Sequence, residues 1–135
     1  MRTGYPEVAA RAGHRCEYCH APEALSNFPF FVDHIIPRTR APELVDDTEN
    51  LALSCPACNL YKSDHIEGTD PETGELTRLF HPRRDSWANH FAWESDELTV
   101  RGLSAIGRAT TSLLRLNSQA QRRARAFWLT SEFFP

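Results

Sequence analysis

The N-terminal half of the chain has a pattern of hydrophobic and polar residues typical of two short strands between two short helices. A proline near the start and a glycine just after the end predict a helix at residues 5–12. Aromatic and β-branched residues predict a strand at 27–36, and a second strand is predicted at 50–54. A helix is predicted to begin near Pro56, because proline suits a first helical turn.

The C-terminal half has shorter apolar runs, separated by residues typical of turns, such as GTDPETGE at 68–75. Ser104 is the expected N-cap of a final arginine-rich helix, which Asn117 and Ser118 interrupt. The other predicted elements are strands at 76–80, 91–93 and 98–101, a turn at 95–96, and a helical turn at 86–89. These elements predict an α+β protein, and 135 residues are enough for one domain with a core but too few for two.

Composition places the chain among ordinary globular proteins. Its residues are 41% apolar and 24% charged, and eight are phenylalanine. The N-terminus has no apolar segment typical of a secretory signal, and no run approaches the roughly 20 apolar residues of a membrane span. We therefore expect a soluble, cytoplasmic protein with no membrane partner.

The distribution of charge matters more than its total. The net charge of −3 argues mildly against a nucleic-acid-binding protein. However, residues 101–130 contain six arginines and no acidic residue. A basic segment of this kind permits local contact with a polyanion, although its usual role is a solvated helix face.

The four cysteines form two CxxC pairs, Cys16/Cys19 and Cys55/Cys58. In an intracellular chain, two such pairs indicate a metal site more strongly than a disulfide framework. Four thiolates complete a tetrahedral zinc ion and leave no open position, so the expected Zn²⁺ is structural. Redox CxxC motifs or free core cysteines are the alternatives.

A carboxylate and an imidazole, Asp33 and His34, stand side by side in the apolar run FVDHIIPR. Two strands and a helix joined by zinc would bring both residues and Asn59 to one cleft. Carboxylate and amide oxygens suit Mg²⁺ or Mn²⁺, and a neutral histidine can remove a proton from water. A metal ion with a general base is typical of phosphodiester hydrolysis.

The geometry of a strand limits this hypothesis. Neighbouring side chains of a regular strand point to opposite faces, so Asp33 and His34 cannot both face one cleft from a flat strand. We therefore predict that the backbone twists or bulges at this pair, and that Pro37 ends the strand.

The combination of CEYC, VDHIIPR and ENLALSCPACNLYK resembles the HNH endonucleases. The segments DPETGEL, RLFHPRRDSWANHF and GLSAIGRAT extend the resemblance over nearly the whole chain. It implies a ββα-metal fold with a four-cysteine structural zinc in a core at about 14–66. A C-terminal extension of short strands and helix would follow at about 69–135.

The resemblance also implies a role for each matching residue. His34 matches the general base that activates water, and Asp33 matches a position that commonly ligates the catalytic Mg²⁺ or Mn²⁺. Asn50 matches the central residue that ties the loop between the strands and holds the base. Asn59 matches a second metal-binding position, and Lys62 matches a recurring lysine that can meet a phosphate. The loop before Asn50 lacks the glycine pair of many relatives.

Further arginines are candidates for binding DNA, although each also has a structural interpretation. Arg38 lies four residues after His34, and Arg83 and Arg84 can either contact phosphates or pair with Asp85. His81, among aromatic residues, is expected to be a satisfied histidine on a half-buried surface.

The main hypothesis is therefore a metal-dependent DNA endonuclease that uses one divalent ion and a histidine base. The alternative is a non-catalytic, zinc-stapled module that binds DNA or protein. Cutting both strands would require a homodimer or two successive nicks.

Overall fold

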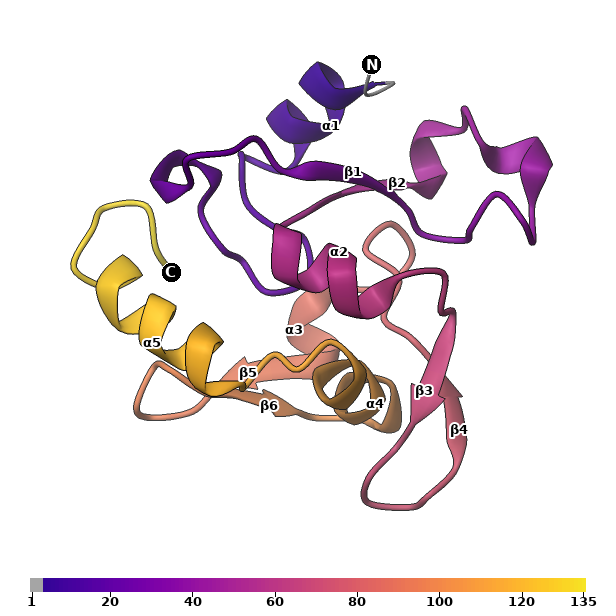
Figure 1. Cartoon of the computed structure of the whole chain (residues 1–135). Helices are drawn as coiled ribbons and strands as arrows, with labels where there is room; N and C mark the ends of the chain where they lie inside the picture. Colours follow the sequence, from indigo (N-terminus) through magenta and orange to yellow (C-terminus); the bar gives the residue numbers. More distant parts are fainter. Residues whose placement is uncertain (1–3) are drawn as a thin grey trace.

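The centre of the N-terminal half is a pair of antiparallel strands followed by a helix (Figure 1). In the computed structural model, which describes residues 4–135, these are β1 (Phe31–His34), β2 (Leu51–Ser54) and α2 (Pro56–Lys62). The strands pair in a regular register that runs from Phe31 opposite Ser54 to His34 opposite Leu51. All four residues of β2 are buried, so the β1–β2 pair is part of the core.

Strand β1 is shorter than the strand predicted at 27–36, because its partner β2 has only four residues. Asn50, expected to open β2, ends the short 3₁₀ helix η3 (Thr48–Asn50) just before it. Two other 3₁₀ turns lie in the loops, η1 (Glu23–Leu25) and η2 (Pro42–Leu44). Helix α1 (Tyr5–Arg11) packs against β1 and β2 through Val8 and Ala9.

The C-terminal half consists of two short hairpins and three helices. The first hairpin joins β3 (Glu67–Thr69) to β4 (Leu76–Arg78), and the second joins β5 (Phe91–Trp93) to β6 (Val100–Gly102). The helices are α3 (Trp87–His90), α4 (Ala105–Leu113) and α5 (Gln119–Trp128). Strand β3 was not predicted because it is only three residues long, with exposed polar residues on either side of Gly68.

Serine caps divide the arginine-rich C-terminal segment into two helices. The Ser104 hydroxyl accepts the backbone N–H of Gly107 at 3.0 Å, and the Ser118 hydroxyl accepts that of Gln121 at 3.1 Å. Such bonds satisfy N–H groups that the first turn of a helix leaves without partners. The predicted interruption at residues 117–118 is thus the start of a second helix.

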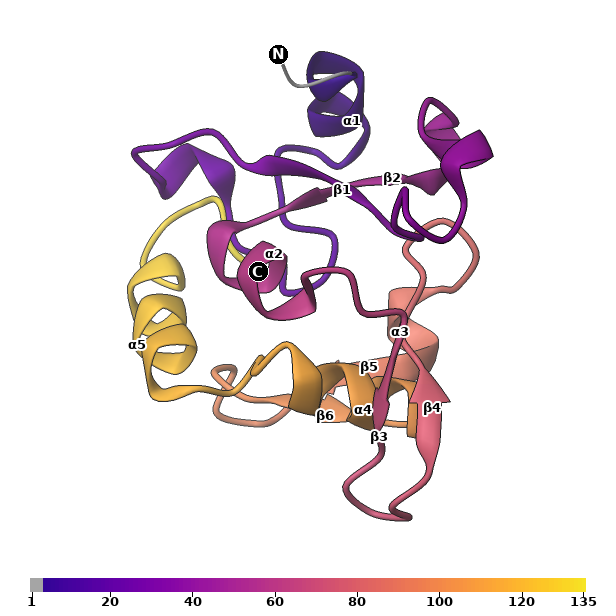
Figure 2. The same ribbon diagram turned by 45° about the vertical axis from the view of Figure 1, so that its right-hand side comes forward.

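One hydrophobic core joins the two halves, so the chain forms a single α+β domain. In both views α2 lies between the β1–β2 pair and the C-terminal elements (Figures 1 and 2). Phe80 and Phe91 pack in the same core as Leu53 and Tyr18, and the Trp87 indole donates to the Tyr18 carbonyl at 2.9 Å. Among the described residues, no helix is long and apolar enough to cross a membrane.

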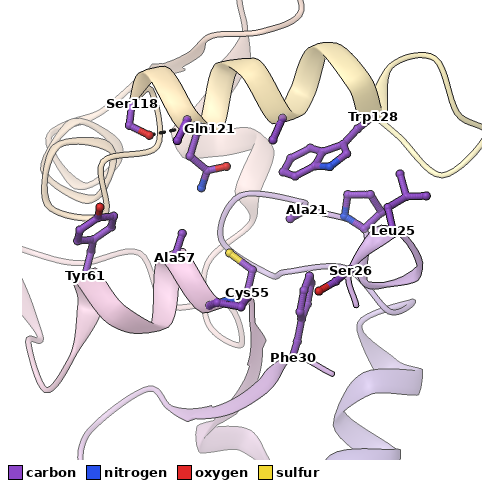
Figure 3. Close-up of a pocket in the computed structure, with 14 residues that line it drawn as sticks. Ala21, Leu25, Ser26, Phe30, Cys55, Ala57, Tyr61, Ser118, Gln121 and Trp128 are labelled. Atoms are coloured by element: carbon purple, nitrogen blue, oxygen red, sulfur yellow. Dashed lines mark hydrogen bonds between the residues drawn. The ribbon is translucent and has the colours of Figure 1, made fainter. Parts of the chain in front are cut away.

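A pocket of about 350 Å³ lies between α2, α5 and the segment 21–30 (Figure 3). Its lining is mostly apolar and includes Ala57, Trp128 and Phe30. The buried Gln121 carboxamide also lines it, and its Nε2 has no hydrogen-bond partner within residues 4–135.

Candidate active site

The four cysteines meet at one buried point below the β1–β2 pair. Their Sγ atoms all lie within 4.8 Å of one another, and those of Cys19 and Cys55 are 3.6 Å apart. Zinc–sulfur bonds of about 2.3 Å in a tetrahedron place sulfur atoms roughly 3.8 Å apart, so these residues fit Zn²⁺. The predicted convergence of both CxxC pairs is confirmed, and the set supports a closed, structural site.

Zinc would connect parts of the chain that are distant in sequence. Cys16 and Cys19 belong to a turn closed by pairing of Arg15 with Pro22, whereas Cys55 is the N-cap of α2 and Cys58 lies in its first turn. A metal ion at this point fixes the start of α2 relative to the strand that precedes it. The residues after Cys58 on α2 then take defined positions beneath β1.

His34 is half-buried at the end of β1, and its ring is oriented by the loop between the strands. The Nε2 atom lies 3.0 Å from the carbonyl oxygen of Val45. A carbonyl oxygen can only accept a hydrogen bond, so Nε2 carries the hydrogen in this contact. In the neutral ring Nδ1 is then the basic nitrogen, which is the state that a general base requires.

Asn50 fixes the two ends of this loop to each other. Its carboxamide accepts the backbone N–H of Ile36 at 2.9 Å and donates to the Ile36 carbonyl at 3.0 Å. The Asn50 carbonyl in turn accepts the N–H of Ile35 at 2.9 Å. The loop that carries Val45 is therefore held beside His34, as expected of a residue that positions the base.

Asp33 does not share a face with His34. Its carboxylate is 6% exposed and accepts a hydrogen bond of 2.7 Å from the Tyr18 hydroxyl. It also forms an ion pair with Lys62, whose Nζ lies 3.2 and 3.3 Å from the two carboxylate oxygens. Burial raises the pKa of Asp33 above its usual value, while Lys62 and Tyr18 oppose this rise.

The predicted bulge at the DH pair is wrong. Each residue of β1 faces one residue of β2 in an unbroken ladder, so Asp33 and His34 point to opposite faces of the strand. Asp33 finds its partners beneath the strand, and His34 finds its partner in the loop. A mechanism that places both side chains on one phosphate does not fit this geometry.

The divalent site expected at Asp33 and Asn59 does not fit the side chains as they lie. An ammonium group contacts both oxygens of Asp33, and a divalent cation would have to displace it. Asn59 is half-buried on α2, one turn before Lys62, and its carboxamide makes no hydrogen bond with any residue in 4–135. Of the expected metal ligands, only Asn59 therefore has a free oxygen.

The phosphate contact expected of Lys62 is excluded in this structure by burial. Lys62 is 1% exposed, and its ammonium also donates to the carbonyls of His34 at 3.3 Å and Ile35 at 3.0 Å. Three acceptors occupy the three donors of the ammonium group. Lys62 thus holds α2 against the end of β1.

The arginines expected to bind DNA differ in their surroundings. Arg38 and Arg84 are exposed, and neither guanidinium has an acidic partner in the described part of the chain. Arg83 instead forms an ion pair with Glu17. The carboxylate of Asp85, a candidate partner for Arg83 or Arg84, binds both terminal nitrogens of Arg78 at 2.8 and 2.9 Å.

Comparison with known families decides the nature of the N-terminal half. Residues 16–65 match the family model described as HNH endonuclease. These residues form an HNH domain. The matched segment contains both CxxC pairs, the DH pair, Asn50 and Asn59.

A curated relative that matches this chain is longer than the chain. The chain is 26% identical over 106 residues to the Septu protein PtuB of Bacillus thuringiensis. The aligned region covers 78% of this chain and 38% of that relative. No solved structure matches the chain.

Two residues that shape the HNH site were not identified from the sequence. Tyr18 lies between the first two cysteines and was not considered as a partner of Asp33, while Val45 acts through its carbonyl, which every residue type possesses. For Tyr18 a signal existed, since a buried phenol needs a polar partner. For Val45 no side-chain signal exists.

Proposed function

We propose that this protein is a nuclease that hydrolyses phosphodiester bonds in DNA, with His34 as the general base. The observation that carries the proposal is the hydrogen bond between His34 Nε2 and the Val45 carbonyl, within a segment that matches the HNH family. This bond fixes both the direction of the ring and its tautomer. A surface histidine without a chemical role would need neither a fixed ring direction nor a fixed tautomer.

The proposed reaction starts with a water molecule next to Nδ1 of His34. As the water oxygen attacks phosphorus, its proton passes to Nδ1 and the bond from phosphorus to the 3′ oxygen breaks. The 3′ oxygen leaves with the bonding electrons and takes a proton from solvent water. The products that the family resemblance implies carry a 5′-phosphate and a 3′-hydroxyl. Asn50 acts as a positioning residue, because it fixes the loop whose carbonyl orients the ring.

In this proposal Asp33 and Lys62 have structural roles, in place of the metal and phosphate contacts expected from the sequence. Asp33, Tyr18 and Lys62 form a buried network that supports the backbone of the active-site strand. The HNH resemblance implies a divalent ion, and the carboxamide of Asn59 is the accessible oxygen ligand on α2. Exposed Arg38 and Arg84 would attract the DNA backbone through charge.

Plasmid nicking tests this proposal. Supercoiled DNA would be incubated with the parent protein in EDTA, Mg²⁺ or Mn²⁺, beside His34→Ala and a control, His14→Asn. His14 is exposed with a backbone φ of 56°, a conformation that asparagine tolerates, and within residues 4–135 its ring forms a polar contact with Glu23. We expect His34→Ala to cut roughly 10²–10⁴-fold more slowly than the parent, because a general base contributes about that factor.

The control should cut at the parent rate. Equal rates for the parent and His34→Ala would refute the assigned base. If the parent, after zinc loading, cuts no DNA with any of these ions, the chain is instead a zinc-stapled binding module.

A further inference from the structure

A second site lies next to the strand that carries His34. A cavity of about 420 Å³ opens between the turn after β1, the end of α2 and the segment after β4. Ile35 and Ile36 line one side, and His81 and Arg84 line the other. Ile35 and Ile36 directly follow His34 in the sequence, so the cavity lies at the end of the strand that carries His34.

The charges around the cavity favour an anion. Three cationic side chains line it, those of Lys62, Arg78 and Arg84, and its described lining contains no acidic residue. Two of these cations already have carboxylate partners, Asp33 for Lys62 and Asp85 for Arg78. The guanidinium of Arg84 has none within residues 4–135 and is exposed.

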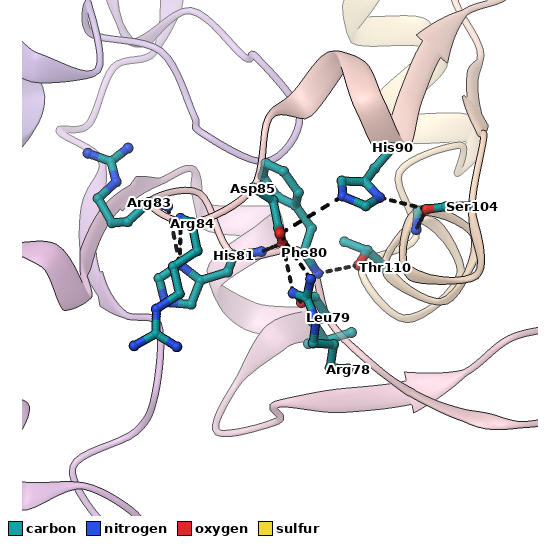
Figure 4. Close-up of polar contacts among 11 residues, drawn as sticks. Arg78, Leu79, Phe80, His81, Arg83, Arg84, Asp85, His90, Ser104 and Thr110 are labelled. Atoms are coloured by element: carbon teal, nitrogen blue, oxygen red, sulfur yellow. Dashed lines mark hydrogen bonds and ion pairs between the residues drawn. The ribbon is translucent and has the colours of Figure 1, made fainter.

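His81 adds a directed hydrogen-bond donor to this positive charge. It is 9% exposed, and its Nδ1 accepts the backbone N–H groups of Arg83 and Arg84, each at 3.2 Å (Figure 4). An Nδ1 that accepts hydrogen bonds leaves the hydrogen of the neutral ring on Nε2. That N–H has no partner in the described part of the chain.

Burial and a neighbouring cation favour the neutral form of the His81 ring. Burial, followed by the positive charge of Arg84, lowers the pKa of His81 below its usual value. The ring therefore offers one donor at neutral pH. Figure 4 shows the Arg84 side chain beside the His81 ring, with the guanidinium groups of Arg83 and Arg84 pointing in different directions.

We propose that this cavity binds a backbone phosphate of the DNA substrate through the Arg84 guanidinium and the Nε2–H of His81. A phosphate diester accepts hydrogen bonds and donates none, which matches a site that offers only donors. The apolar side chains of Ile36 and Leu79 provide a surface for the attached sugar. This inference rests on the proposed function, because its ligand is the DNA substrate of that function.

Equilibrium binding tests the site without requiring cleavage. A fluorescein-labelled DNA duplex would be titrated with His34→Ala protein over a range of salt concentrations, followed by anisotropy. Into this background we would introduce Arg84→Gln, His81→Asn or the control Arg101→Gln. The control removes an equally exposed charge, which pairs with Glu94 on the β5–β6 hairpin.

The variants separate the two proposed contacts. Arg84→Gln should weaken binding about tenfold and lower the slope of log K against log salt by about 0.9, the value for one phosphate contact. Asparagine at position 81 places an acceptor near the former Nδ1 but has no atom at Nε2. His81→Asn should therefore retain the native unfolding temperature within a few degrees, weaken binding a few-fold and leave the salt slope unchanged.

Cleavage distinguishes failure of this site from failure of the nuclease assignment. In the otherwise unmodified protein, Arg84→Gln should raise KM while kcat changes less than twofold. One outcome would overturn the phosphate site but leave the nuclease proposal intact. In it, Arg84→Gln nicks DNA with the parent KM, and both Arg84→Gln and His81→Asn bind DNA like the Arg101→Gln control. If the parent protein does not nick DNA but the salt slope of binding still depends on Arg84, the nuclease proposal is overturned and the phosphate site is still supported.

Discussion

Lys62 is the only lysine in the sequence, and its position explains several features of the active-site strand. Its ammonium binds the carboxylate of Asp33 and two backbone carbonyls at the end of β1. An isolated buried charge costs several kcal/mol, so neither partner of this ion pair tolerates loss of the other. Replacement of Lys62 by methionine should therefore destabilise the protein by about 3–5 kcal/mol.

Chemical labelling checks the burial of Lys62 directly. An amine-reactive reagent can modify only the N-terminus and Lys62, because the chain has no other primary amine. We expect one modification in the native protein and two after unfolding, measured by intact-mass and peptide mass spectrometry. Rapid labelling of Lys62 in the folded protein would show that its ammonium is free, as a phosphate-binding role requires.

At the residue scale, the chemical type of a site residue was easier to predict from the sequence than the direction in which its side chain points. The four cysteines converge as their type and spacing suggested, whereas Asn50 ends a 3₁₀ turn and does not open β2. Asp33 was assigned to a metal because carboxylate oxygens suit divalent ions, and Lys62 was assigned to a phosphate because it matches a recurring lysine of the resembled family. Their pairing across 29 residues is a tertiary contact that no local pattern reports.

The loop between β1 and β2 is the element that orients the His34 ring. It contains no regular structure beyond two 3₁₀ turns, and most of its residues after Pro37 are exposed. Its path is fixed where Asn50 binds both backbone groups of Ile36. Arg11 adds a second restraint near the end of the loop, because its guanidinium donates to the carbonyls of Thr48 and Leu51.

Replacement of Asn50 by aspartate tests the restraint at Ile36. Aspartate retains an oxygen for the Ile36 N–H but places a second oxygen against the Ile36 carbonyl, where the amide donor was. We expect a loss of about 1–3 kcal/mol in the free energy of unfolding, measured with denaturant, and a slower single-turnover cleavage rate.

Asn27→Asp is the matched control, because Asn27 is exposed and makes no side-chain hydrogen bond with another described residue. Unchanged cleavage by a destabilised Asn50→Asp protein would show that the loop does not position the base.

Elements with strong local signals were predicted more accurately than those defined by their partners. Ser104 and Ser118 cap two helices, and both signals are present in the sequence. Strand β3, in contrast, depends on pairing with β4 and on close packing of Gly68 against Leu113 of α4. A glycine flanked by polar residues gives no strand signal by itself.

At the scale of the whole molecule, the cysteine cluster lies where the two halves of the chain meet. Arg125 of α5 is buried, and its guanidinium donates to the carbonyls of Leu98 at 2.7 Å and Leu116 at 2.5 Å. Burial lowers its pKa, and the nearby thiols of Cys19 and Cys58 oppose that shift. Four thiolates around Zn²⁺ would carry a net negative charge, which this cation would offset.

Removal of zinc should therefore unfold the entire chain. We expect one zinc per chain by elemental analysis, and loss of helical circular dichroism and tryptophan burial together when a strong chelator is added. Cys58→Ser should give the same unfolded state. A metal-free Cys58→Ser protein with native circular dichroism would contradict the structural role of the site.

The central claim concerns His34, and its most direct test is chemical rescue of single-turnover cleavage. The account predicts that His34→Gly, with native circular dichroism and zinc content, cuts a labelled DNA duplex far more slowly than the parent. Added imidazole should restore part of that rate in a concentration-dependent way, since it can occupy the space left by the ring and accept the proton. Cleavage by His34→Gly at the parent rate, without imidazole, would contradict the account.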